Sequence, residues 1–491
     1  MMIYSTVDAE NSAGGDLTEN LALKTDSYKI NHWNMYPKGT TKVYSYYESR
    51  KGAKYDYTPF FGLQYILMRH FTGKRINRFD IDMAGQLMKW HFGTDAYFNR
   101  DGWNHILNEH GGRLPVRIRA VPEGTLVPTG NVMMTIENTC DKCAWVTNSM
   151  ETLLCHVWYP STVAAKSLFI KRMLDRYLEL TSDSKAGLPF MLHDFGYRGA
   201  TCNESAGIGG MAHLMNFVGT DTIAAMTHAI KYYNANPETL AYSVAATEHS
   251  VMTAYGPVGG EERIVEELLD KYPSGILSVV SDSYNIENFI NNIVGKKFRD
   301  RILARTGSGP LPHGVFVTRP DSKRDAEDTP EKQMVELAKM HWENFGGTTN
   351  SKGYKVIDPH VRLLWGDGID DDGIGKILIN MIMAGFSVEN IATFGMGGGL
   401  LQKVNRDTQR FAFKSSHQIR YGLGYDIFKK PMDESKVSKK GRLKLVDKNG
   451  ILITVHELEP GKDILETVFE NGELVKTYTF DEVRKNTQKG V

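Results

Sequence analysis

The side chains best suited to chemistry come at the ends of six short apolar runs in the middle of the chain. In VFVTRPDS (315–322), mostly apolar, strand-like residues lead directly into Arg319, Pro320 and Asp321. The six runs end, in order, in Asp194, Glu248-His249, Asp282, Arg319 with Asp321, Asp367, and Gly397-Gly398-Gly399. Any single loop can be polar, but six polar ends in similar positions indicate one shared site.

Two arginines and a glycine-rich segment are suited to phosphate. The guanidinium groups of Arg198 and Arg319 can bind phosphate oxygens bidentately. The glycines within 395–399 leave backbone amides open to an anion, and Arg406 follows them. The glycines within 207–210 could act in the same way ahead of a helix. Tight turns explain both segments equally well, and neither matches a nucleotide-hydrolase loop or a dinucleotide fingerprint.

Three aspartates and one histidine supply the remaining polar chemistry. Asp282, Asp321 and Asp367 could hold Mg²⁺ with phosphate oxygens, although each one alone is more commonly a helix cap or a loop residue. His249 follows Glu248, whose carboxylate could orient the imidazole and raise its basicity. A lone histidine usually has a structural role, but the position of this one at the shared ends favours a function.

The six runs are expected to be strands of a barrel, because each is nearly continuous in apolar residues, as strands covered on both faces are. Helical segments separate them, and Asp370, Asp371 and Asp372 are expected to be a solvated helix start. The C-terminal strand ends of a βα barrel meet at one rim, where active sites are built. The runs span 189–196, 240–249, 275–283, 314–322, 361–368 and 390–399.

The two ends of the chain carry β patterns instead. Turn residues separate short β-prone runs within 117–139, and Asn449-Gly450 and Asn471-Gly472 lie between strand-like runs, which is a hairpin signal. Residues 145–180 have a mostly helical period, with an expected break at Pro160. We therefore expect the two ends to pack together as one β-rich domain.

Length and composition favour a two-domain globular protein. The chain has 491 residues, too many for one simple core. We predict a β-rich domain with helices from residues 1–185 and 400–491, and an α/β barrel domain at 186–399. Apolar residues make up 41% and charged residues 24%, as in an enzyme or a binding protein. Lys+Arg and Asp+Glu both total 58, so no charge bias indicates nucleic acid or a membrane as a partner.

Targeting signals and cysteines point to the cytoplasm. The start MMIYSTVDAENSAGG lacks a basic region and an apolar run, and no apolar stretch is long enough to cross a bilayer. Only four cysteines occur, which suits a reducing compartment. Cys140 and Cys143 have the spacing of half a zinc site, but no second cysteine or histidine pair follows at a suitable distance. We expect reduced structural thiols.

Three aromatic residues could bind a flat ring. Phe195 and Tyr197 lie beside one strand end and Tyr28 lies far upstream, and a flat ring could stack between two of them. The residues thus predict a barrel enzyme that acts on a phosphorylated, Mg²⁺-bound substrate with a flat ring. They do not determine the reaction.

Long segments along nearly the whole chain, from about residue 21, occur together in one known family. The segments are TDSYKINHWNMYPKGTTKVYSYYESR (25–50), WVTNSMETLLCHVWYP (145–160), LHDFGYRGATCNESAGIGGMAHLMNFVGTD (192–221), AATEHSVMTAYG (245–256), VVSDSYNIENF (279–289), TRPDS, WGDGID and FGMGGGLLQKVNRDTQRFAFKSS (394–416). In order and content they resemble the nicotinamide phosphoribosyltransferase family. Two positions depart from the family pattern: Ala245 stands in place of proline, and Ala412 stands where vertebrate members carry serine.

The resemblance implies a fold and a reaction. The fold would be that of a type II phosphoribosyltransferase, an irregular (β/α) barrel plus a β-rich α+β domain built from both chain ends. The reaction would join nicotinamide to 5-phosphoribosyl 1-pyrophosphate, giving nicotinamide mononucleotide and pyrophosphate on a salvage route to NAD. The resemblance further implies Mg²⁺ as cofactor, ATP as a co-substrate that phosphorylates His249, with Glu248 as its orienting partner, and a homodimer with two sites at its interface.

The resemblance also implies roles for single residues. Phe195 and Tyr28 of the partner subunit would enclose the pyridine ring, and Asp221 would accept a hydrogen bond from the carboxamide. The other implied contacts are Arg198, His249 and Arg319 along the pyrophosphate and ring pocket, Asp282 and Asp321 for Mg²⁺ and ribose, Gly366, Asp367, Gly397 and Gly398 for ribose and the 5′-phosphate, Arg406 for a phosphate, and Arg50, Lys414 and Lys429 for further anion contacts from the partner subunit.

Two rival functions remain at this point. A nicotinate phosphoribosyltransferase would share the fold, but a carboxylate at Asp221 would repel an acid substrate and accept an amide donor. A catalytically idle binding protein could use the same scaffold, but the intact set of arginines, aspartates and His249 argues against it.

Overall fold

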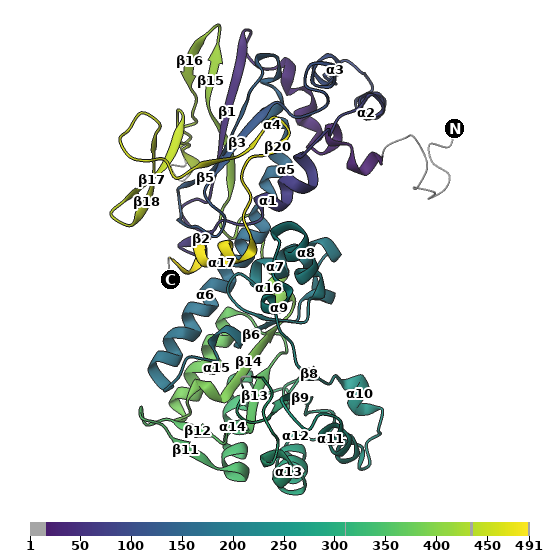
Figure 1. Cartoon of the computed structure of the whole chain (residues 1–491), viewed down its shortest axis with the longest axis vertical. Coiled ribbons are helices and arrows are strands. Elements are labelled where there is room, and N and C mark those ends of the chain that lie inside the picture. The colour runs from purple at the N-terminus through teal and green to yellow at the C-terminus, as the bar shows by residue number, and fades with distance from the viewer. Residues whose placement is uncertain (1–15, 310, 433–435, 490–491) are drawn as a thin grey trace, which may run out of the picture. The chain divides into compact units, whose positions relative to one another are not determined.

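The structure is a computed structural model that describes residues 16–309, 311–432 and 436–489. The chain divides into two compact units (Figure 1). One, here called the β-rich unit, comprises residues 1–162, 231–235 and 405–491, and the other, the barrel unit, comprises 163–230 and 236–404. The expectation about a signal peptide concerns residues 1–15, which lie outside the described residues.

Parallel strands form the centre of the barrel unit. Their order is β7-β6-β14-β13-β10-β9-β8, and every neighbouring pair is parallel. The described strands of this sheet are β6 (Leu192–Asp194), β7 (Gly219–Thr220), β8 (Ala245–Ala246), β9 (Ile276–Val280), β10 (Val315–Arg319), β13 (Val361–Trp365) and β14 (Ile391–Met396). All six predicted runs therefore contain a strand, and β7 is an additional one that the apolar pattern did not indicate.

The sheet curls until its two edge strands approach each other. Tyr242, shortly before β8, accepts a hydrogen bond from the amide of Thr220 at 3.2 Å, and its own amide donates to the carbonyl of Val218 at 2.7 Å. These bonds form a parallel bridge to β7. Strands this short and irregular at the closing point make the barrel irregular, and the predicted fold class of an irregular (β/α) barrel with a β-rich companion is confirmed.

Helices surround the curled sheet, as Figure 1 shows for α11 to α15. The described α-helices are α6 (Trp158–Thr181), most of which belongs to this unit, α7 (Asn203–His213), α8 (Ile223–Tyr233), α9 (Pro237–Leu240), α10 (His249–Thr253), α11 (Gly260–Lys271), α12 (Ile286–Asn288), α13 (Arg299–Leu303), α14 (Pro330–Phe345), α15 (Asp371–Met383) and α16 (Gly398–Leu401). Most of the strands are buried on both faces, as the apolar runs predicted, and Phe316 in β10 is completely buried, whereas Ala246 in β8 is exposed. A small hairpin, β11 (Gly347–Thr349) and β12 (Lys355–Ile357), adds to this unit.

Two local predictions in the barrel unit can be compared directly with the structure. Asp370 caps α15 by accepting a hydrogen bond from the Gly373 amide at 2.9 Å, so the acidic run is a helix start, as expected, but Asp371 is buried and not solvated. The glycines of 207–210 lie inside α7 and not in an anion-binding loop ahead of it. A Cβ atom at Gly207 would lie 2.3 Å from the ring of His228, so these glycines allow close helix packing.

The β-rich unit is built around an antiparallel sheet of order β16-β15-β1-β5-β3-β19-β20. Its described strands are β1 (Thr40–Glu48), β3 (Val116–Ala120), β5 (Val132–Asn138), β15 (Ala412–Arg420), β16 (Leu423–Asp426), β19 (Glu466–Glu470) and β20 (Glu473–Leu474), with the pairs β2 (Tyr57–Pro59)–β4 (Leu126–Pro128) and β17 (Leu443–Lys448)–β18 (Ile451–His456) beside it. Both predicted hairpins form. Asn449 and Asn471 adopt positive φ angles of 58° and 51° before their glycines, as a type I′ turn requires.

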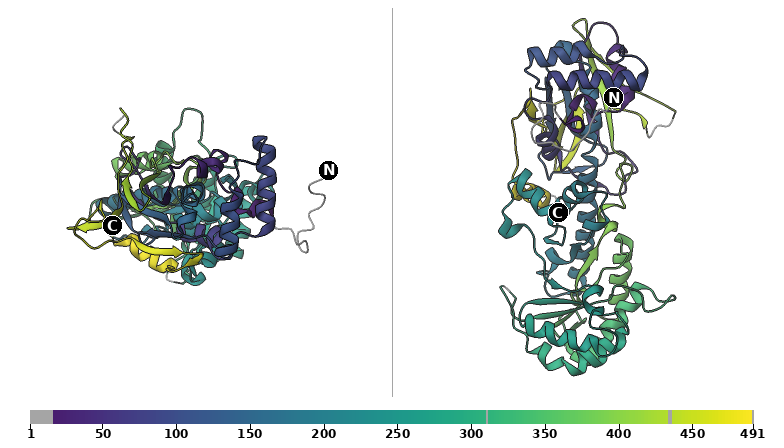
Figure 2. Two further views of the ribbon diagram at one scale, coloured as in Figure 1. Left: turned by 90° about the horizontal axis from the view of Figure 1, so that it is seen from above. Right: turned by 90° about the vertical axis from the view of Figure 1, so that its right-hand side faces the viewer.

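Helices of the β-rich unit include α2 and α3, which pack against each other (Figure 2). The described α-helices are α1 (Leu63–Ile66), α2 (Arg78–Phe92), α3 (Arg100–Glu109), α4 (Val146–Ser149), α5 (Glu151–Cys155) and α17 (Phe480–Gln488). The expected break near Pro160 is found slightly earlier, at residues 156–157 between α5 and α6, and Pro160 lies in the first turn of α6, where its missing amide costs no helical hydrogen bond. None of the described helices is long and apolar enough to cross a membrane.

Candidate active site

The C-terminal strand ends of the barrel bring together residues that are far apart in the sequence. His193 on β6 donates a hydrogen bond from Nε2 to Oδ1 of Asp221, which directly follows β7, at 2.9 Å. Its ring also lies 5.2 Å from that of Phe195. Arg319, the last residue of β10, places its guanidinium carbon 5.9 Å from the Phe195 ring centre. Aromatic, cationic and anionic groups thus meet at one rim.

Asp221 is held so that one oxygen stays available. Its Oδ1 atom accepts a hydrogen bond from the Ser243 hydroxyl at 2.6 Å and also meets His193, and both contacts from described side chains end on this oxygen. Burial raises the pKa of Asp221, but the hydrogen bonds from His193 and Ser243 and the charges of His193 and Arg319 outweigh it, so the pKa is lowered. The side chain is therefore an ionised acceptor with Oδ2 free for a ligand.

Phe195 takes its place because glycines surround its ring. A Cβ atom on Gly395 would lie 2.0 Å from Phe195 Cε2, closer than non-bonded carbon atoms can approach. A Cβ atom on Gly366 would lie 3.2 Å from the same carbon. These two predicted glycines thus leave room for an aromatic ring that is half-buried at the rim.

Arg319 is a largely buried cation among acids. One of its Nη atoms donates to the carbonyl of Thr247 at 2.8 Å, while its buried Nε has no hydrogen-bond partner among the described residues. Burial lowers the pKa of Arg319, and the neighbouring Asp321, Asp221 and Asp282 oppose that effect. The positive charge of Arg198, in an exposed turn, lies near enough to act on Arg319 in the same direction as burial. The two cations therefore leave donors free for an anion.

Asp282 and Asp321 form a pair of acids beside these arginines. Oδ2 of Asp282 accepts hydrogen bonds from the Asp321 amide at 2.9 Å and from the Ser322 hydroxyl at 2.6 Å. Oδ1 of Asp282 is buried and has no hydrogen-bond partner among the residues that the structure describes. Asp367 lies near both, and burial, followed by the charges of Asp321 and Asp282, raises its pKa. Three mutually repelling carboxylates with a buried unpaired oxygen fit a divalent cation bound through oxygen ligands.

His249 faces this carboxylate group. Its Nε2 atom lies 3.5 Å from Asp282 Oδ1 and 3.8 Å from Asp321 Oδ2, and its Nδ1 atom lies 3.4 Å from the Ser283 hydroxyl. Glu248, the predicted orienting partner, occupies the N-cap position of α10, and its carboxylate accepts a hydrogen bond from the Ser250 hydroxyl. The carboxylates beside the imidazole are therefore Asp282 and Asp321, and the Glu248–His249 contact is not formed in this structure.

The glycine-rich segment after β14 begins the short helix α16. Gly397 is its N-cap residue, and a Cβ atom on Gly398 would meet nothing within 4 Å, so open space lies in front of this turn. The buried Lys166 of α6 donates a hydrogen bond to the carbonyl of Gly399 at 2.5 Å and so fixes the turn. Asp194 is completely buried, its Oδ1 accepts from the Gly196 amide, its Oδ2 has no hydrogen-bond partner among the described residues, and burial raises its pKa to about 6.

Five predicted residues belong to the β-rich unit. Tyr28 has 62% of its surface exposed. Lys414 on β15 is close to two other predicted cations: burial lowers its pKa first, and the charges of Lys429 and Arg50 lower it further. Arg50 also donates through Nε to the carbonyl of Arg410 at 2.9 Å. The structure thus gathers Arg50, Lys414 and Lys429 into a basic group, and Arg406 lies in a turn of the same unit.

Sequence reasoning missed two side chains at the rim. His193 precedes Asp194 by one residue and Phe195 by two, so the alternation of side chains along a strand would have placed it on the same face as Phe195. Glu261 on α11 is buried, and its Oε1 has no hydrogen-bond partner in the described part of the chain. Burial, followed by the charge of Asp282, raises the pKa of Glu261 to about 7. No local pattern marks Glu261, because its neighbours read as an ordinary amphipathic helix.

Family models match most of the chain. Residues 20–118 match the model described as "Nicotinamide phosphoribosyltransferase, N-terminal domain". Residues 190–473 match the model described as "Nicotinate phosphoribosyltransferase (NAPRTase) family". The second match alone includes the whole candidate site of the barrel unit.

Curated relatives extend over nearly the full length. A protein of Xanthomonas campestris pv. campestris named nicotinamide phosphoribosyltransferase is 44% identical over 482 residues, covering 95% of this chain and 97% of its own. A protein of Acinetobacter baylyi with the same name is 34% identical over 494 residues, covering 94% of this chain and 95% of its own.

Two solved structures share the fold. Nicotinate-nucleotide pyrophosphorylase from Pyrococcus furiosus has a TM-score of 0.59 at 14% identity and covers 98% of this chain and 97% of its own. Human nicotinic acid phosphoribosyltransferase has a TM-score of 0.57 at 14% identity and covers 95% of this chain and 93% of its own. At this identity the likeness establishes the fold class alone.

Proposed function

This chain belongs to the nicotinamide phosphoribosyltransferases of the nicotinate phosphoribosyltransferase family, and from this premise we propose that its substrate is nicotinamide. The chain is an enzyme, a phosphoribosyltransferase of NAD salvage. The proposed reaction transfers the phosphoribosyl group of 5-phosphoribosyl 1-pyrophosphate to nicotinamide and yields nicotinamide mononucleotide and pyrophosphate. The names of the curated relatives support this choice over nicotinate.

The observation that carries the proposal is the state of Asp221. Its carboxylate is ionised, because its pKa is lowered, and its Oδ1 is occupied by His193 and Ser243. The remaining oxygen can accept a hydrogen bond from a carboxamide N–H. A nicotinate carboxylate would bring a second negative charge to the same place, and such like-charge contacts cost several kcal/mol (roughly 2–4) in a recognition site.

Phe195 and Arg319 position the two reacting partners. The half-buried Phe195 ring offers a flat apolar surface beside Asp221, on which a pyridine ring can stack with its carboxamide toward the acid. Arg319 lies between this ring and the carboxylate group, and its unpaired Nε, together with the exposed Arg198, can donate to pyrophosphate oxygens. Tyr28 of the partner subunit is proposed as the second aromatic surface.

The bond changes need no proton transfer. The pyridine nitrogen donates its lone pair to the anomeric carbon, the bond from that carbon to the pyrophosphate oxygen breaks, and pyrophosphate leaves with the electron pair. The chain contributes proximity by stacking the ring, and it stabilises the departing negative charge with arginines. The pyridine nitrogen needs no general base, because it carries no proton when it attacks. In the proposed ring site, Asp221 accordingly serves as a hydrogen-bond acceptor for the carboxamide and not as a base.

Mg²⁺ fits the carboxylate group of the rim. Asp282, with its unpaired buried Oδ1, and Asp321 would hold it, with Asp367 nearby and Glu261 adding negative charge behind them. When bound, the ion would supply positive charge that neutralises the pyrophosphate. Open space lies in front of Gly398 for the 5′-phosphate, and the backbone at Gly366 and Gly397, which lies close to Phe195, is proposed to contact the ribose.

His249 is proposed to accept a phosphoryl group from ATP. The γ-phosphorus would bond to an imidazole nitrogen, and ADP would leave with the electron pair. The imidazole is 40% exposed and lies beside the proposed Mg²⁺ acids, which supports access for a metal-bound nucleotide. In this proposal the histidine couples ATP hydrolysis to synthesis, and Asp282 and Asp321 orient it.

The homodimer is a further part of the proposal. The basic group of Arg50, Lys414 and Lys429 would contact anions of the substrate bound at the partner's barrel, and Arg406 would reach a phosphate. Mixing two inactive variants tests it, for example Arg50→Ala with Asp282→Asn. If each site uses both protomers, random heterodimers restore about a quarter of the wild-type sites. No recovery on mixing, with dimers present, would contradict shared sites.

Replacing Asp221 by asparagine tests the substrate proposal. The ratio of kcat/KM for nicotinamide to that for nicotinate should fall at least about tenfold in Asp221→Asn, because the like charge is removed. Asp300→Asn on α13, whose side chain is 98% exposed, is the matched control and should leave the ratio unchanged. An unchanged ratio in Asp221→Asn would refute the assignment.

The phosphohistidine proposal has a separate test. Intact mass measured at neutral pH after incubation with ATP and Mg²⁺ should show one added phosphoryl group, absent in His249→Ala. Turnover of His249→Ala should be reduced relative to wild type only when ATP is present. An equal reduction without ATP would assign His249 to direct substrate binding.

A further inference from the structure

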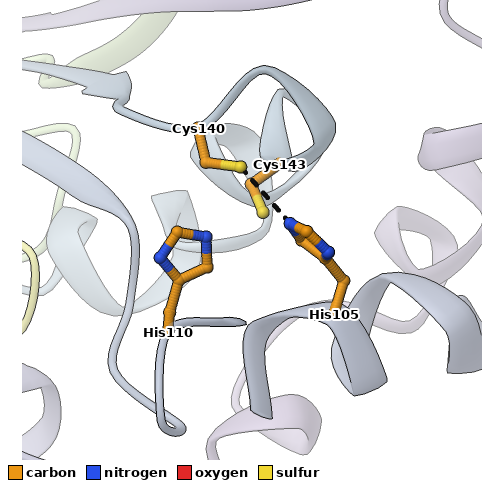
Figure 3. Close-up of side chains that lie close together, drawn as sticks. All are labelled: His105, His110, Cys140 and Cys143. Atoms are coloured by element: carbon orange, nitrogen blue, oxygen red, sulfur yellow. Dashed lines mark hydrogen bonds between the residues drawn. The ribbon is translucent and has the colours of Figure 1, made fainter. Parts of the chain in front are cut away.

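Two histidines and two cysteines in the β-rich unit gather into a compact cluster, shown in Figure 3. In that view one ring nitrogen of His105 and one of His110 face the sulfur atoms of Cys140 and Cys143. Each residue offers one ligand atom, and the four atoms lie within 4.8 Å of one another. His105 Nε2 and Cys140 Sγ are 3.4 Å apart.

These separations are close to those that zinc imposes. Zinc binds sulfur at about 2.3 Å and nitrogen at about 2.0–2.1 Å, so the corners of its tetrahedron are about 3.3–3.8 Å apart. The 3.4 Å pair already has this spacing, and the longer separations need side-chain movements on the order of 1 Å to match it. Imidazole and thiolate are the ligands that structural zinc sites use.

The backbone holds both halves of the cluster in place. His105 lies on α3, and His110 is the C-cap residue of that helix, its amide donating to Ile106 at 3.2 Å. The turn of Cys140 and Cys143 is closed by a hydrogen bond from the Cys143 amide to the Cys140 carbonyl at 2.9 Å. The same carbonyl also accepts from the Asn138 side chain at 2.8 Å. A metal ion would therefore find the ligand directions largely set.

One polar atom of the cluster has no partner among the described residues. Cys143 is completely buried, and His110 Nε2 is buried without a hydrogen-bond partner among the described residues. A buried ring nitrogen left unpaired is costly, and most such atoms in folded proteins have a partner. Coordination would supply that partner.

Aromatic side chains pack near the cluster, and a cleft connects it to solvent. Trp103 and Trp145 pack edge to face beside it, with ring centres 4.9 Å apart. A cleft of about 560 Å³ is lined by His105, Asp141 and Trp145 and opens a path for an ion. The cluster has four protein ligands and thus no open position, which is typical of structural and not of catalytic zinc.

We propose that His105, His110, Cys140 and Cys143 bind one zinc ion that fastens the end of α3 to the turn at 140–143. Binding displaces the two thiol protons, so the two thiolates balance the charge of Zn²⁺. The sequence expectation of reduced structural thiols considered only partners after Cys143, whereas the histidine pair comes before Cys140. The site lies in the β-rich unit and is separate from the Mg²⁺ acids proposed in the barrel unit.

Metal analysis of the full chain, purified without chelators or a metal-affinity tag, is the first test. About one zinc per chain is expected, as for a single closed four-ligand site. After exchange for Co²⁺, the protein should show the visible bands of tetrahedral cobalt and a thiolate-to-cobalt charge-transfer band. His105→Ala and Cys140→Ser should each weaken Zn²⁺ binding, measured against a competing chelator, by more than about 10–100-fold. That is the loss typical when only a residue that hydrogen-bonds to a metal ligand is replaced.

Matched controls separate the cluster from general effects. Cys155→Ser and His91→Ala alter the same residue types in the same unit outside the cluster and should leave the zinc content and affinity unchanged. Because ligand variants can fold poorly, the wild type is also measured alone. A chelator should lower its Tm, and Zn²⁺ but not Mg²⁺ should restore it.

Three results would overturn the proposal. The first is that the wild-type protein neither retains nor binds Zn²⁺ and that its Tm changes with neither chelator nor Zn²⁺. The second is zinc content that is the same in the ligand variants as in the controls. The third is a disulfide between Cys140 and Cys143, found by peptide mapping of freshly purified protein, which would assign the pair to thiol redox chemistry.

Discussion

Two buried carboxylates, one in each unit, are held in opposite ways. Glu123 in the β-rich unit is 2% exposed, and both of its oxygens accept hydrogen bonds, from two backbone amides and the hydroxyl of Tyr233. Asp282 in the barrel unit has a side chain that is 8% exposed, and only its Oδ2 is satisfied. Its Oδ1 faces His249 with no hydrogen bond.

The difference separates structural from functional burial. A buried polar group with all its partners stabilises the fold, whereas an unpaired one costs free energy that a ligand can recover. Asp282, Arg319 and Glu261 all carry unpaired buried atoms at one rim. Changes at Glu123 should therefore act on stability, and changes at the rim should act on turnover.

The largest effect is expected from Asp282→Asn. The amide keeps one oxygen for the Asp321 amide and the Ser322 hydroxyl but loses the charge that would hold Mg²⁺. The kcat/KM for 5-phosphoribosyl 1-pyrophosphate should fall about 10²–10³-fold, the loss typical of one transition-state electrostatic contact. Steady-state kinetics and a Tm measurement check this, with Asp300→Asn as control. A large fall in Tm with little change in turnover of the folded protein would show that Asp282, like Glu123, acts on stability, and would contradict its proposed functional role.

Glu123→Gln should have the next largest effect, on stability. A neutral amide replaces one acceptor oxygen by a donor facing backbone amides, which costs about 1–3 kcal/mol. The kcat/KM per folded molecule should not change. Denaturant unfolding with activity measured in parallel tests both statements, and loss of turnover without loss of stability would contradict them.

The pH dependence of this stability has a defined sign. Burial raises the pKa of Glu123 to about 7 from a usual 4.5, so the unfolded chain releases this proton at lower pH than the folded one. The stability from the neutral carboxyl is therefore full below about pH 4.5 and is lost as the pH rises to about 7, by about 3 kcal/mol. The gap in unfolding free energy between wild type and Glu123→Gln should accordingly narrow from pH 5 to about pH 8.

A smaller effect is expected from Gly395→Ala. Its Cβ would lie 2.0 Å from Phe195, so the ring must move, and KM for nicotinamide should rise about tenfold, or about 1.4 kcal/mol. Gly375→Ala on α15, whose Cβ would lie 3.4 Å from Met173, is the control and should bind nicotinamide normally. Unchanged KM in Gly395→Ala would remove Phe195 from the ring site.

The smallest effect is the pH dependence of selectivity. Because the pKa of Asp221 is lowered, its carboxylate stays ionised at every pH above the usual value of about 3.9. The preference for nicotinamide over nicotinate should thus stay constant from about pH 5.5 to about pH 9, where nicotinate is also ionised. Competition assays across this range check it, and a preference that rises steeply near neutral pH would assign the selectivity to a different group.

Sequence patterns predicted the barrel well but the site only in part. Most buried parallel strands are long enough to show as apolar runs. Asp282, Arg319 and Asp321 could be predicted as site residues because they come at the ends of such runs. β7 is too short to leave a periodic signal, so the contact of His193 with Asp221 could not be derived. The contact of His105 with Cys140 joins segments 35 residues apart in the chain. The orientation of Glu248 toward Ser250 depends on one rotamer. Such contacts are set by tertiary packing and not by local pattern.

The most direct test of the account is product identification by mass spectrometry. The protein is mixed with Mg²⁺, 5-phosphoribosyl 1-pyrophosphate and equal amounts of nicotinamide and nicotinate, with and without ATP. The account predicts nicotinamide mononucleotide as the product in both mixtures, with more of it when ATP is present. Nicotinate mononucleotide as the main product would contradict the role of Asp221 and with it the proposed function.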